Sequence, residues 1–409
     1  MRVLLIGGGA REHALAARIL ESPLLTKLYW LPGNAALEGQ AEKVTNLDPC
    51  SGPEVAAWAR AQAVDLAVIG PEAPLLAGVS DCLEEAGIPC FGPSRAAARL
   101  EGSKAFAKEL MTAWSIPTAR YVKVAGPREA AETVARWGAP VVIKADGLAA
   151  GKGVTVAMTG EEARQAALTL SGPAVIEEYL EGEELSFMVL AQGRRWLPLV
   201  PSRDYKRIGA GDTGPNTGGM GAVASFALLG GDLHEEIGAR IIAPVLAAMA
   251  EAGTPFKGVL YAGLMLTGDG PKVLEFNARF GDPETQAILQ LWQDDLLAVL
   301  AEVARGGLPE KLTWSREEAL CLVLASGGYP GPFRRGYPIQ GLAAAARQVK
   351  VYHGGTELRQ GQAVTAGGRV LTLAAAAESL ALVRERVYAA ARTVAFTDMY
   401  YRTDIGAGF

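Results

Sequence analysis

The sequence predicts a multidomain protein of mixed α/β and α+β class, with an N-terminal parallel-sheet domain and a small mixed domain at the C-terminus. Three observations predict this. Short apolar runs alternate with helical patterns over roughly the first hundred residues, which is typical of βαβ units. A glycine-rich central region then separates longer apolar strands, and short strands with a last amphipathic helix follow. The 409 residues suffice for two to four domains with full cores.

The N-terminal elements follow one another in βαβ order. We expect strands at residues 3–6, 27–31, 66–69 and 88–91, and helices at residues 12–20, 53–63 and 79–86. Each strand ends in glycine or proline. In open α/β sheets the loops at the carboxyl ends of the strands bind ligands, so we expect these loops to converge on one crevice.

The first of these loops, GGGAREHA, has only two of the three glycines of a dinucleotide fingerprint. Gly7 and Gly9 fit, but Glu12 stands in the third position, and Asn34 rather than an acid follows the second strand. A nicotinamide cofactor is therefore disfavoured. Backbone N–H groups at a helix start, with the charge of Arg11, favour a single bound phosphate over the alternative of a purely structural turn.

A second unit is centred on VVIKADGLAAGKGVTVAM, two apolar runs joined by a glycine-rich loop. It is not a Walker A loop, because Gly153 follows Lys152 where Ser or Thr is required. The amides of a glycine hairpin can close on phosphates, and Lys144 on the incoming strand can reach them. A flexible hairpin with solvated lysines is an equally weighted alternative.

Two further segments are candidates for ligand contact. The run AVIEEYL at residues 174–180 has the form of a linker between two lobes, whose backbone could read an adenine edge with Glu184 near a ribose; taken alone, a surface acidic turn is favoured. The segment at residues 201–221 is long, polar and glycine-rich. Structureless loops of such length are usually functional or disordered, and we favour substrate contact through Asn216, Thr217 and the Gly218 and Gly219 amides.

The segment KVLEFNARFGDPET at residues 272–285 predicts a magnesium and phosphate site. Side chains alternate along a strand, so Glu275, Asn277 and Arg279 are expected on one face. Hard oxygen ligands beside an arginine suit magnesium and the phosphates that it bridges. The preceding strand offers no acid at residues 261–263, so the metal depends on the first two side chains.

The remaining elements frame this segment. We expect a helix at residues 235–251, a strand at residues 258–266, and, from about residue 319, strands at residues 320–325, 349–353 and 369–374 before a last amphipathic helix. The alanine runs at residues 343–346 and 374–377 indicate packing or helix starts. This last part is expected to cap the protein without a catalytic constellation.

The composition bounds the classes of partner. A net charge of −5 and a pI near 5.5 argue against nucleic acid or an anionic membrane, although local basic loops still allow a small anionic substrate. No apolar stretch is long enough for a membrane span or a signal segment, so we expect a cytoplasmic protein. Four cysteines without a CxxC pair and three separated histidines disfavour disulfides, a zinc site and a histidine-based triad.

Together these motifs resemble the glycinamide ribonucleotide synthetase family of the ATP-grasp superfamily. The resemblance is carried in collinear order by GGGAREHALA, PGNAA, IGPEAPL, FGPSRAAARLEGSKAF, VIKADGLAAGKGV, IEEYLEGEE, DTGPNTGGMGA, LYAGLM, EFNARFGDPETQ, ASGGYPG and YRTDIG. It implies a Rossmann-like phosphoribosylamine-binding domain at residues 1–101, a helical linker at 102–119, a small ATP-grasp lobe or lid at 120–186, a large ATP-grasp lobe at 187–318 and a capping domain at 319–409.

The resemblance also implies a reaction, in which ATP phosphorylates glycine and the amine of 5-phosphoribosylamine attacks the glycyl phosphate. The implied cofactors are ATP with Mg²⁺ or Mn²⁺, the partners are small molecules only, and the state is a monomer or weak homodimer. The implied roles are metal binding by Glu275 and Asn277; phosphate binding by Lys104, Lys144, Gly147, Gly151 and Gly153; adenine and ribose binding by Glu177, Glu178, Tyr179, Leu180 and Glu184; catalysis by Arg279, Lys144 and Asp282; and substrate binding by Gly8, Gly9, Arg11, Glu12, Asn34, Asp204, Lys206, Asn216, Thr217, Gly218, Asp282 and Pro283.

Some positions depart from the family pattern. The stretch after Thr159 is shorter than in typical members, Tyr205 replaces a histidine, and Ala278 replaces a cysteine. Another ATP-grasp ligase or a carboxylase is an alternative, which the full-length match disfavours. A nicotinamide-dependent oxidoreductase and a catalytically silent scaffold are more remote alternatives.

Overall fold

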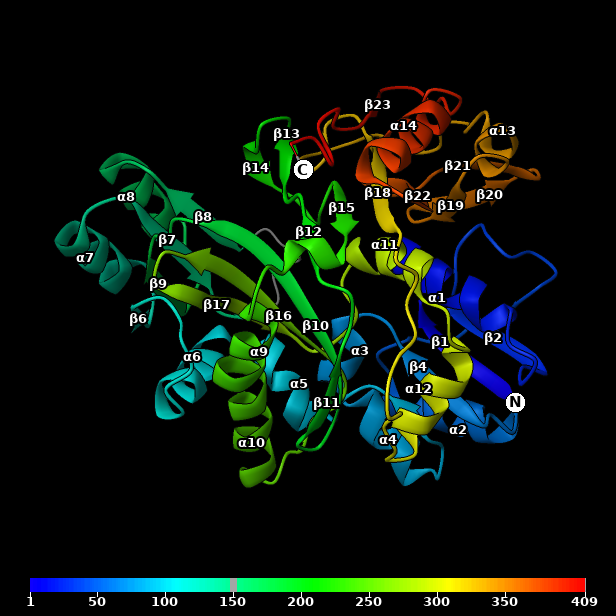
Figure 1. The fold of residues 1–409 in the computed structure, drawn as a ribbon, viewed down its shortest axis with the longest axis horizontal. Helices are drawn as coiled ribbons and strands as arrows, with labels where there is room; N and C mark the ends of the chain where they lie inside the picture. The colour runs from blue at the N-terminus through cyan, green and yellow to red at the C-terminus, as the bar shows by residue number, and fades with distance from the viewer. Residues whose placement is uncertain (148–152, 409) are drawn as a thin grey trace.

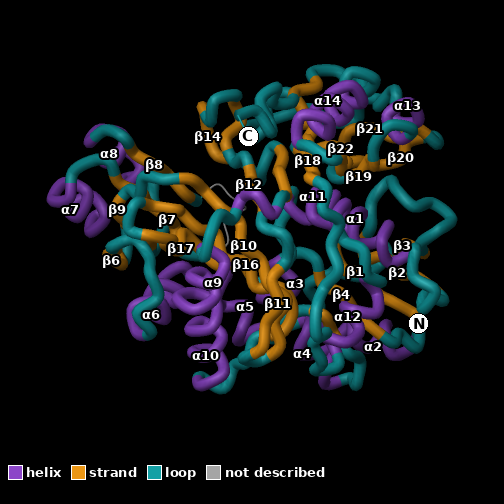
Figure 2. Tube along the Cα trace, viewed as in Figure 1, coloured by secondary structure: helices purple, strands orange, loops and turns teal. Residues whose placement is uncertain are grey.

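The computed structural model describes residues 1–147 and 153–408. The C-terminal region lies against the N-terminal domain, and the central region of the chain extends to the left of both (Figure 1). One small sheet with its two helices extends away from the remainder of the molecule, while the C-terminal region covers the opposite end (Figures 1 and 2). None of the helices among the described residues has both the length and the apolar character needed to cross a bilayer.

The N-terminal domain is built on a parallel sheet in the order β3-β2-β1-β4-β5. Its strands are β1 Arg2–Gly7, β2 Lys27–Pro32, β3 Glu42–Lys43, β4 Leu66–Ile69 and β5 Cys90–Phe91, and its helices are α1 Ala10–Leu20, α2 Gly52–Ala61, α3 Glu72–Ala77, α4 Val79–Glu85 and α5 Arg95–Gly102. The apolar runs of β1 and β4 are buried, as expected for central parallel strands. The chain changes direction across the sheet between β1 and β4, where ligands bind in such folds.

A four-stranded antiparallel sheet, here called the lid, forms the extended unit of Figure 1. It comprises β6 Tyr121–Val124, β9 Ala174–Glu178, β7 Val141–Ala145 and β8 Val154–Ala157, with α7 Pro127–Trp137 and α8 Gly160–Leu168. Its buried side chains make a core of their own. Helix α6 Lys104–Ala113 connects the N-terminal domain to this unit.

A ten-stranded sheet joins the large lobe to the C-terminal region, because β15 pairs with β18. Its main path is β17-β16-β10-β12-β15-β18-β22-β19, with β11 and β23 paired at its side. The strands are β10 Glu183–Gln192, β11 Arg195–Pro198, β12 Ser202–Asp204, β15 Gly221–Ala224, β16 Lys257–Thr267, β17 Gly270–Asn277, β18 Glu318–Ser326, β19 Lys350–His353, β22 Arg369–Ala377 and β23 Met399–Tyr400. The sheet therefore runs without a break past residue 318.

The other elements are short or lie on this sheet. They are the hairpin strands β13 Arg207–Gly209 and β14 Thr213–Asn216, the pair β20 Thr356–Arg359 and β21 Gln362–Thr365, the 3-10 turn Phe226–Leu228, and the helices α9 Leu233–Ile237, α10 Ala243–Glu251, α11 Glu284–Leu291, α12 Leu296–Ala304, α13 Leu342–Ala346 and α14 Leu380–Ala391. Between α9 and α10 the helix widens to a π-turn at Gly238–Ile242. Pro244 explains this, because it cannot donate the next backbone hydrogen bond.

Two local expectations need correction. The segment at residues 201–221 is not an irregular loop, since β12, the β13–β14 hairpin and β15 occupy most of it. Of the two alternatives for the alanines at residues 374–377, packing is confirmed, since they complete β22 and are mostly buried, and a helix start is wrong. In the first case β12 pairs with β15 across the hairpin, and in the second β22 pairs with β18, so that strand pairing overrides local composition.

Candidate active site

Strand β17 carries the two predicted metal ligands. Glu275 pairs with Gly263 and Asn277 with Tyr261 on β16, so both ligands lie on one face and no acid stands opposite them. Among the described residues, no three His, Cys, Asp or Glu side chains gather into a metal site. The carboxylate and carboxamide are hard oxygen donors, which fit a divalent cation that takes its other ligands from phosphate and water.

The charges of three lysines from different parts of the chain act on Glu275. Burial acts to raise the pKa of this carboxyl, but the charges of Lys206, Lys144 and Lys104 outweigh it and keep the pKa below its usual value. Lys104 Nζ also donates to the carbonyl of Gly147 at 2.9 Å. The arrangement places a carboxylate among cations, which suits a polyphosphate with a divalent metal ion.

The base of the predicted glycine hairpin, at Gly147 and Gly153, lies beside these lysines. Gly151 lies outside the described residues, whereas Gly153 accepts a hydrogen bond from the Ala145 amide at 2.8 Å. Asp146 accepts from the Ser103 hydroxyl at 3.2 Å and from the amide that follows Lys104. The base of the hairpin is thereby joined to the start of α6.

Glu177 on β9 is fully buried between two lysines. Its carboxylate lies 2.9 Å from Lys108 Nζ and 3.0 Å from Lys144 Nζ. Lys144 shares a face of the lid sheet with Glu177, because it lies two residues beyond Val142, the strand partner of Glu177. The carboxylate is therefore committed to cations, and only backbone atoms of this residue remain for the predicted adenine contact.

The rest of the predicted adenine segment leads out of the lid. Glu178 ends β9 and accepts a hydrogen bond from the Arg120 amide at 2.9 Å. Tyr179 and Leu180 then connect to β10, where Glu184 forms an ion pair with Lys206 at 2.7 Å. The predicted ribose contact, Glu184, thus lies beside Lys206, one of the lysines whose charge acts on Glu275 of β17.

Arg279 lies just beyond β17, held by two acids from the N-terminal part of the chain. It is 2.8 Å from Glu72 and 2.9 Å from Glu101, and its Nη2 lies 3.4 Å from the side-chain oxygen of Asn277. Burial opposes its charge, but Glu101 and Glu72 outweigh this and raise the pKa of the guanidinium. Its charge and position are therefore fixed next to the end of β17.

Asp282 is linked to the C-terminal region, which was expected only to cap the protein. Arg369 Nη2 donates to its carboxylate at 2.8 Å, Gln286 donates at 2.7 Å, and Arg369 also donates to the carbonyl of Gly218. Burial acts to raise the pKa of Asp282, but the charge of Arg369 outweighs it, and the net pKa is lowered. The C-terminal region thus orients a predicted catalytic residue.

The predicted amide donors at Gly218 and Gly219 are already engaged. The Gly218 amide donates to the Tyr329 hydroxyl and the Gly219 amide to the Thr217 hydroxyl, both at 2.9 Å. The Thr217 hydroxyl in turn donates to the carbonyl of Lys206 at 2.8 Å. These residues shape the turn in this structure, so their expected direct contact with substrate stays a prediction.

A group of buried acids, which sequence patterns did not link, lies behind this turn. Glu284 accepts from the Tyr261 hydroxyl at 2.6 Å. Burial and then the charge of Glu284 raise the pKa of Asp204 well above its ordinary value, and its buried Oδ1 has no hydrogen-bond partner among the described residues. Asp204 and Pro283 approach so closely that a Cβ on Gly219 would lie 2.6 and 2.4 Å from their atoms.

The hairpin of β13 and β14 is fastened by Arg402. Its guanidinium donates to Asp212 at 2.7 Å, to the Arg207 carbonyl at 3.0 Å and to Asp404 at 2.7 Å. Asn216, a predicted substrate contact, ends β14 opposite Arg207. The motif YRTDIG, which had no predicted role, therefore holds a segment of the candidate site.

In the N-terminal loop the predicted substrate residues bind one another. Glu12 accepts from the Gly9 amide at 2.7 Å and from Arg11 Nε at 2.6 Å, and Arg11 donates to the Phe280 carbonyl at 3.0 Å. Gly7 has φ +122°, and a Cβ there would lie 2.5 Å from the Glu12 side chain. Arg11 and Glu12 are buried and shape the loop, and the Gly9 amide already donates to Glu12, so contact of the loop backbone with a phosphate stays a prediction.

Asn34 fastens the same loop to β19. Its side-chain amide donates to the Gly8 carbonyl at 3.0 Å and to the His353 carbonyl at 2.6 Å. The His353 amide donates to His13 Nδ1 at 2.8 Å. Burial, and then the charge of His353, lowers the pKa of His13 to about 3.

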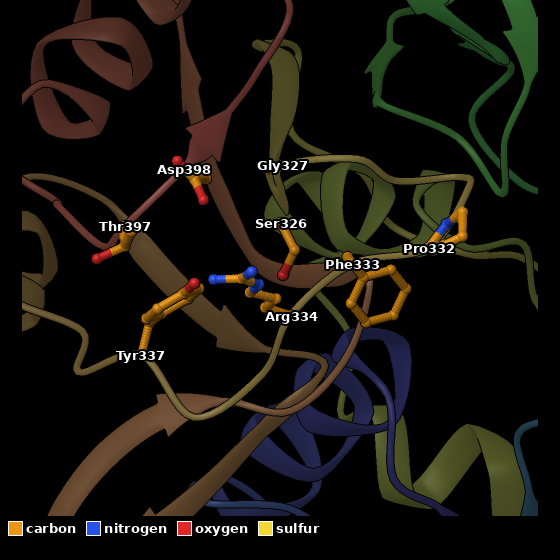
Figure 3. A pocket seen from close by; sticks show the side chains of 8 residues that line it. All are labelled: Ser326, Gly327, Pro332, Phe333, Arg334, Tyr337, Thr397 and Asp398. Atoms are coloured by element: carbon orange, nitrogen blue, oxygen red, sulfur yellow. The ribbon is translucent and has the colours of Figure 1, made fainter.

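One cavity of about 370 Å³ opens in the C-terminal region, apart from the predicted residues (Figure 3). It is lined by Ser326, Gly327, Pro332, Phe333, Arg334, Tyr337, Thr397 and Asp398. None of these residues belongs to the predicted site. The cavity therefore adds nothing to the chemistry considered so far.

The prediction missed Lys108, Glu101 and Arg369. Lys108 had a local signal, because residues four apart share a helix face and Lys104 begins the same helix. Arg369 had none, since it lies 87 residues beyond Asp282 along the chain.

Models of one family match nearly the whole chain in order. Residues 1–101 match the phosphoribosylglycinamide synthetase N domain, residues 102–285 its ATP-grasp (A) domain and residues 319–408 its C domain. A phosphoribosylamine–glycine ligase of Rhizobium meliloti is 47% identical over 415 residues, covering 99% of this chain and 98% of the relative. That of Agrobacterium fabrum is 46% identical with the same coverage.

Solved structures agree with these matches. The crystal structure of phosphoribosylamine–glycine ligase from Thermotoga maritima has a TM-score of 0.84 at 33% identity, covering 99% of this chain and 100% of that one. The biotin carboxylase from Campylobacter jejuni has a TM-score of 0.73 at 16% identity, covering 97% of this chain and 92% of that chain, which shows a shared fold alone.

Proposed function

The chain belongs to the phosphoribosylglycinamide synthetase family of ATP-dependent ligases, and we propose that it joins glycine to the amine of 5-phosphoribosylamine in purine biosynthesis. The observation that carries this proposal is the full-length, collinear match to relatives of that name. The three lysines whose charges act on Glu275 support it, because a ligase of this kind must hold ATP. The cytoplasmic location, the domain limits and the monomeric or weakly dimeric state remain predictions.

The chemistry needs charge neutralisation and positioning more than a histidine base. A carboxylate is a poor electrophile, because its leaving group would be oxide. Transfer of the γ-phosphoryl group from ATP to the glycine carboxylate gives glycyl phosphate and ADP. The amine then attacks the carbonyl carbon, loses a proton and expels phosphate, which yields glycinamide ribonucleotide.

On the nucleotide side, Lys104 and Lys144 would bind phosphate oxygens beneath the glycine hairpin. Arg279, held in place by its two acids, would face the transferring phosphoryl group. Glu275 and Asn277 would hold Mg²⁺ or Mn²⁺, which when bound neutralises phosphate charge.

The other ligands would bind around these groups. The backbone at residues 177–180 would hold adenine and Glu184 the ribose. Asp282, oriented by Arg369, would place glycine or the attacking amine. The backbone at Gly8 and Gly9 would bind the phosphoribosyl group, at the carboxyl end of β1.

The test is ADP release by the purified protein with ATP, Mg²⁺, glycine and phosphoribosylamine. We expect release to require both glycine and the amine, and turnover with bicarbonate but none with glycine would refute the proposal. Glu275→Gln should keep the fold, as measured by circular dichroism. It should lower turnover by about 100-fold or more, because the metal ion that neutralises the phosphates would lose its carboxylate ligand. Glu310→Gln, at an exposed glutamate, is the matched control. Unchanged turnover in Glu275→Gln would remove the metal role.

A further inference from the structure

Lys108 is a buried cation for which the proposed chemistry has no use. Its side chain is 2% exposed and lies 2.9 Å from Glu177 Oε2. Its ammonium also donates to the Thr118 hydroxyl at 2.7 Å, and that hydroxyl donates to the Val273 carbonyl at 2.7 Å. Helix α6, the lid and β17 thus meet at one lysine.

The two oxygens of Glu177 are held unequally. Lys144 Nζ lies 3.0 Å from Oε1 without an aligned hydrogen bond to it among the described residues, and the same ammonium donates to the Leu274 carbonyl at 2.8 Å. Lys108 also donates to a neighbour, the Thr118 hydroxyl, but its side chain is enclosed, whereas the charge of Lys144 also acts on Glu275 in the predicted phosphate site. Lys108 is therefore tied to Glu177 inside the structure, while Lys144 lies between Glu177 and the predicted phosphate site.

We propose that Lys108 is a positioning residue, which neutralises Glu177 so that Lys144 is free to move onto the phosphates of ATP. This rests on the proposed function, in which Lys144 binds ATP. Removing one partner from a buried ion pair is costly, because the remaining charge has lost its solvent. With Lys108 present, Glu177 stays paired when Lys144 turns to the nucleotide. Without it, ATP and Glu177 compete for one lysine.

The experiment measures the Kd of ATP with Mg²⁺ by calorimetry, together with the KM for glycine. Lys108→Met should raise the Kd of ATP by about tenfold or more and leave the KM for glycine within about twofold. The double variant Lys108→Met/Glu177→Gln should return the Kd to within about threefold of wild type, because the unpaired charge is gone. Lys123→Met, at an exposed lysine of the lid strand β6, is the control.

An unchanged Kd in Lys108→Met would overturn the proposal, and so would a raised Kd that the second substitution does not restore. Should the methionine variant fail to fold, Lys108→Arg takes its place: retention of ATP affinity within about threefold is expected with charge kept, and a tenfold loss would overturn the idea. The proposed function fails separately. A wild-type protein that binds ATP but releases no glycine-dependent ADP refutes the ligase assignment and leaves this binding test intact.

Discussion

The buried imidazole of His13 should lower the free energy of unfolding in mild acid, and the substitution His13→Asn should remove this effect. The imidazole is buried beside Trp30, Tyr352 and His353, and its Nδ1 accepts the His353 amide, so the native state requires the neutral form. Burial first, and the charge of His353 second, lowers its native pKa to about 3. In the unfolded chain the pKa returns to about 6.5. Between these values the unfolded state binds the additional proton, so stability falls as pH falls below about 6.5.

The magnitude at pH 5 follows from the unfolded state alone. The native pKa of about 3 lies well below pH 5, so its own value hardly matters there. A pH of 5 is about 1.5 below the unfolded pKa, which at about 1.4 kcal/mol for each pH unit gives a loss of about 2 kcal/mol. Any contribution of His353, whose pKa is lowered to about 4 by burial, adds to this loss.

The assay is urea unfolding at pH 7 and pH 5 for wild type and His13→Asn. Asparagine can accept the His353 amide at the same place but does not titrate in this range. We expect the variant to lose about 2 kcal/mol less than wild type between the two pH values. Equal slopes of free energy against urea are needed for the comparison to be between the same states. An equal loss in both proteins would refute the reasoning.

Two further substitutions test the surroundings of Asp282 and Pro283. Arg369→Met removes the charged hydrogen bond to Asp282, so the KM for glycine or phosphoribosylamine should rise by about tenfold. The KM for ATP should stay within about twofold of wild type. An ATP-specific defect would contradict this. Gly219→Ala should destabilise the protein by about 1–3 kcal/mol in urea, because φ is +104° and the Cβ would lie 2.4 Å from Pro283, whereas Gly230→Ala, with open space around it, should change little.

Much of the fold could be predicted because short apolar strands lie between glycine and proline. The expected strand at residues 66–69 coincides with β4, and the helix expected at residues 53–63 with most of α2. The segment at residues 201–221 was harder, since the strands at its two ends pair with β10 and with β18, and β18 lies far away along the chain. Local composition shows only glycine and charge there, and a sequence pattern does not reveal such distant partners.

In the candidate site, too, local motifs could be predicted from the sequence and distant partners could not. Glu275, Asn277 and Lys144 could be singled out because each lies in a short run whose residue types point to phosphate and metal chemistry. The ion pairs that surround the site could not be predicted, because the partners come from distant parts of the chain. Arg279 pairs with Glu101 from an N-terminal helix, and Asp282 pairs with Arg369 from the C-terminal region. Burial and pairing decide these charges, and neither can be seen in a motif.

The fastening of the β13–β14 hairpin also fixes an order of events during synthesis. Arg402 lies 190 residues beyond Asp212, and Arg369 lies 87 beyond Asp282. Chains emerge from the ribosome N-terminal part first, and domains fold as units as they emerge. All the residues of α6, the lid and β17 are present on a nascent chain well before either arginine has been added. The predicted nucleotide part of the site can therefore be built while translation continues, whereas the contacts of Asp282 have to wait for Arg369 and those of the hairpin for Arg402.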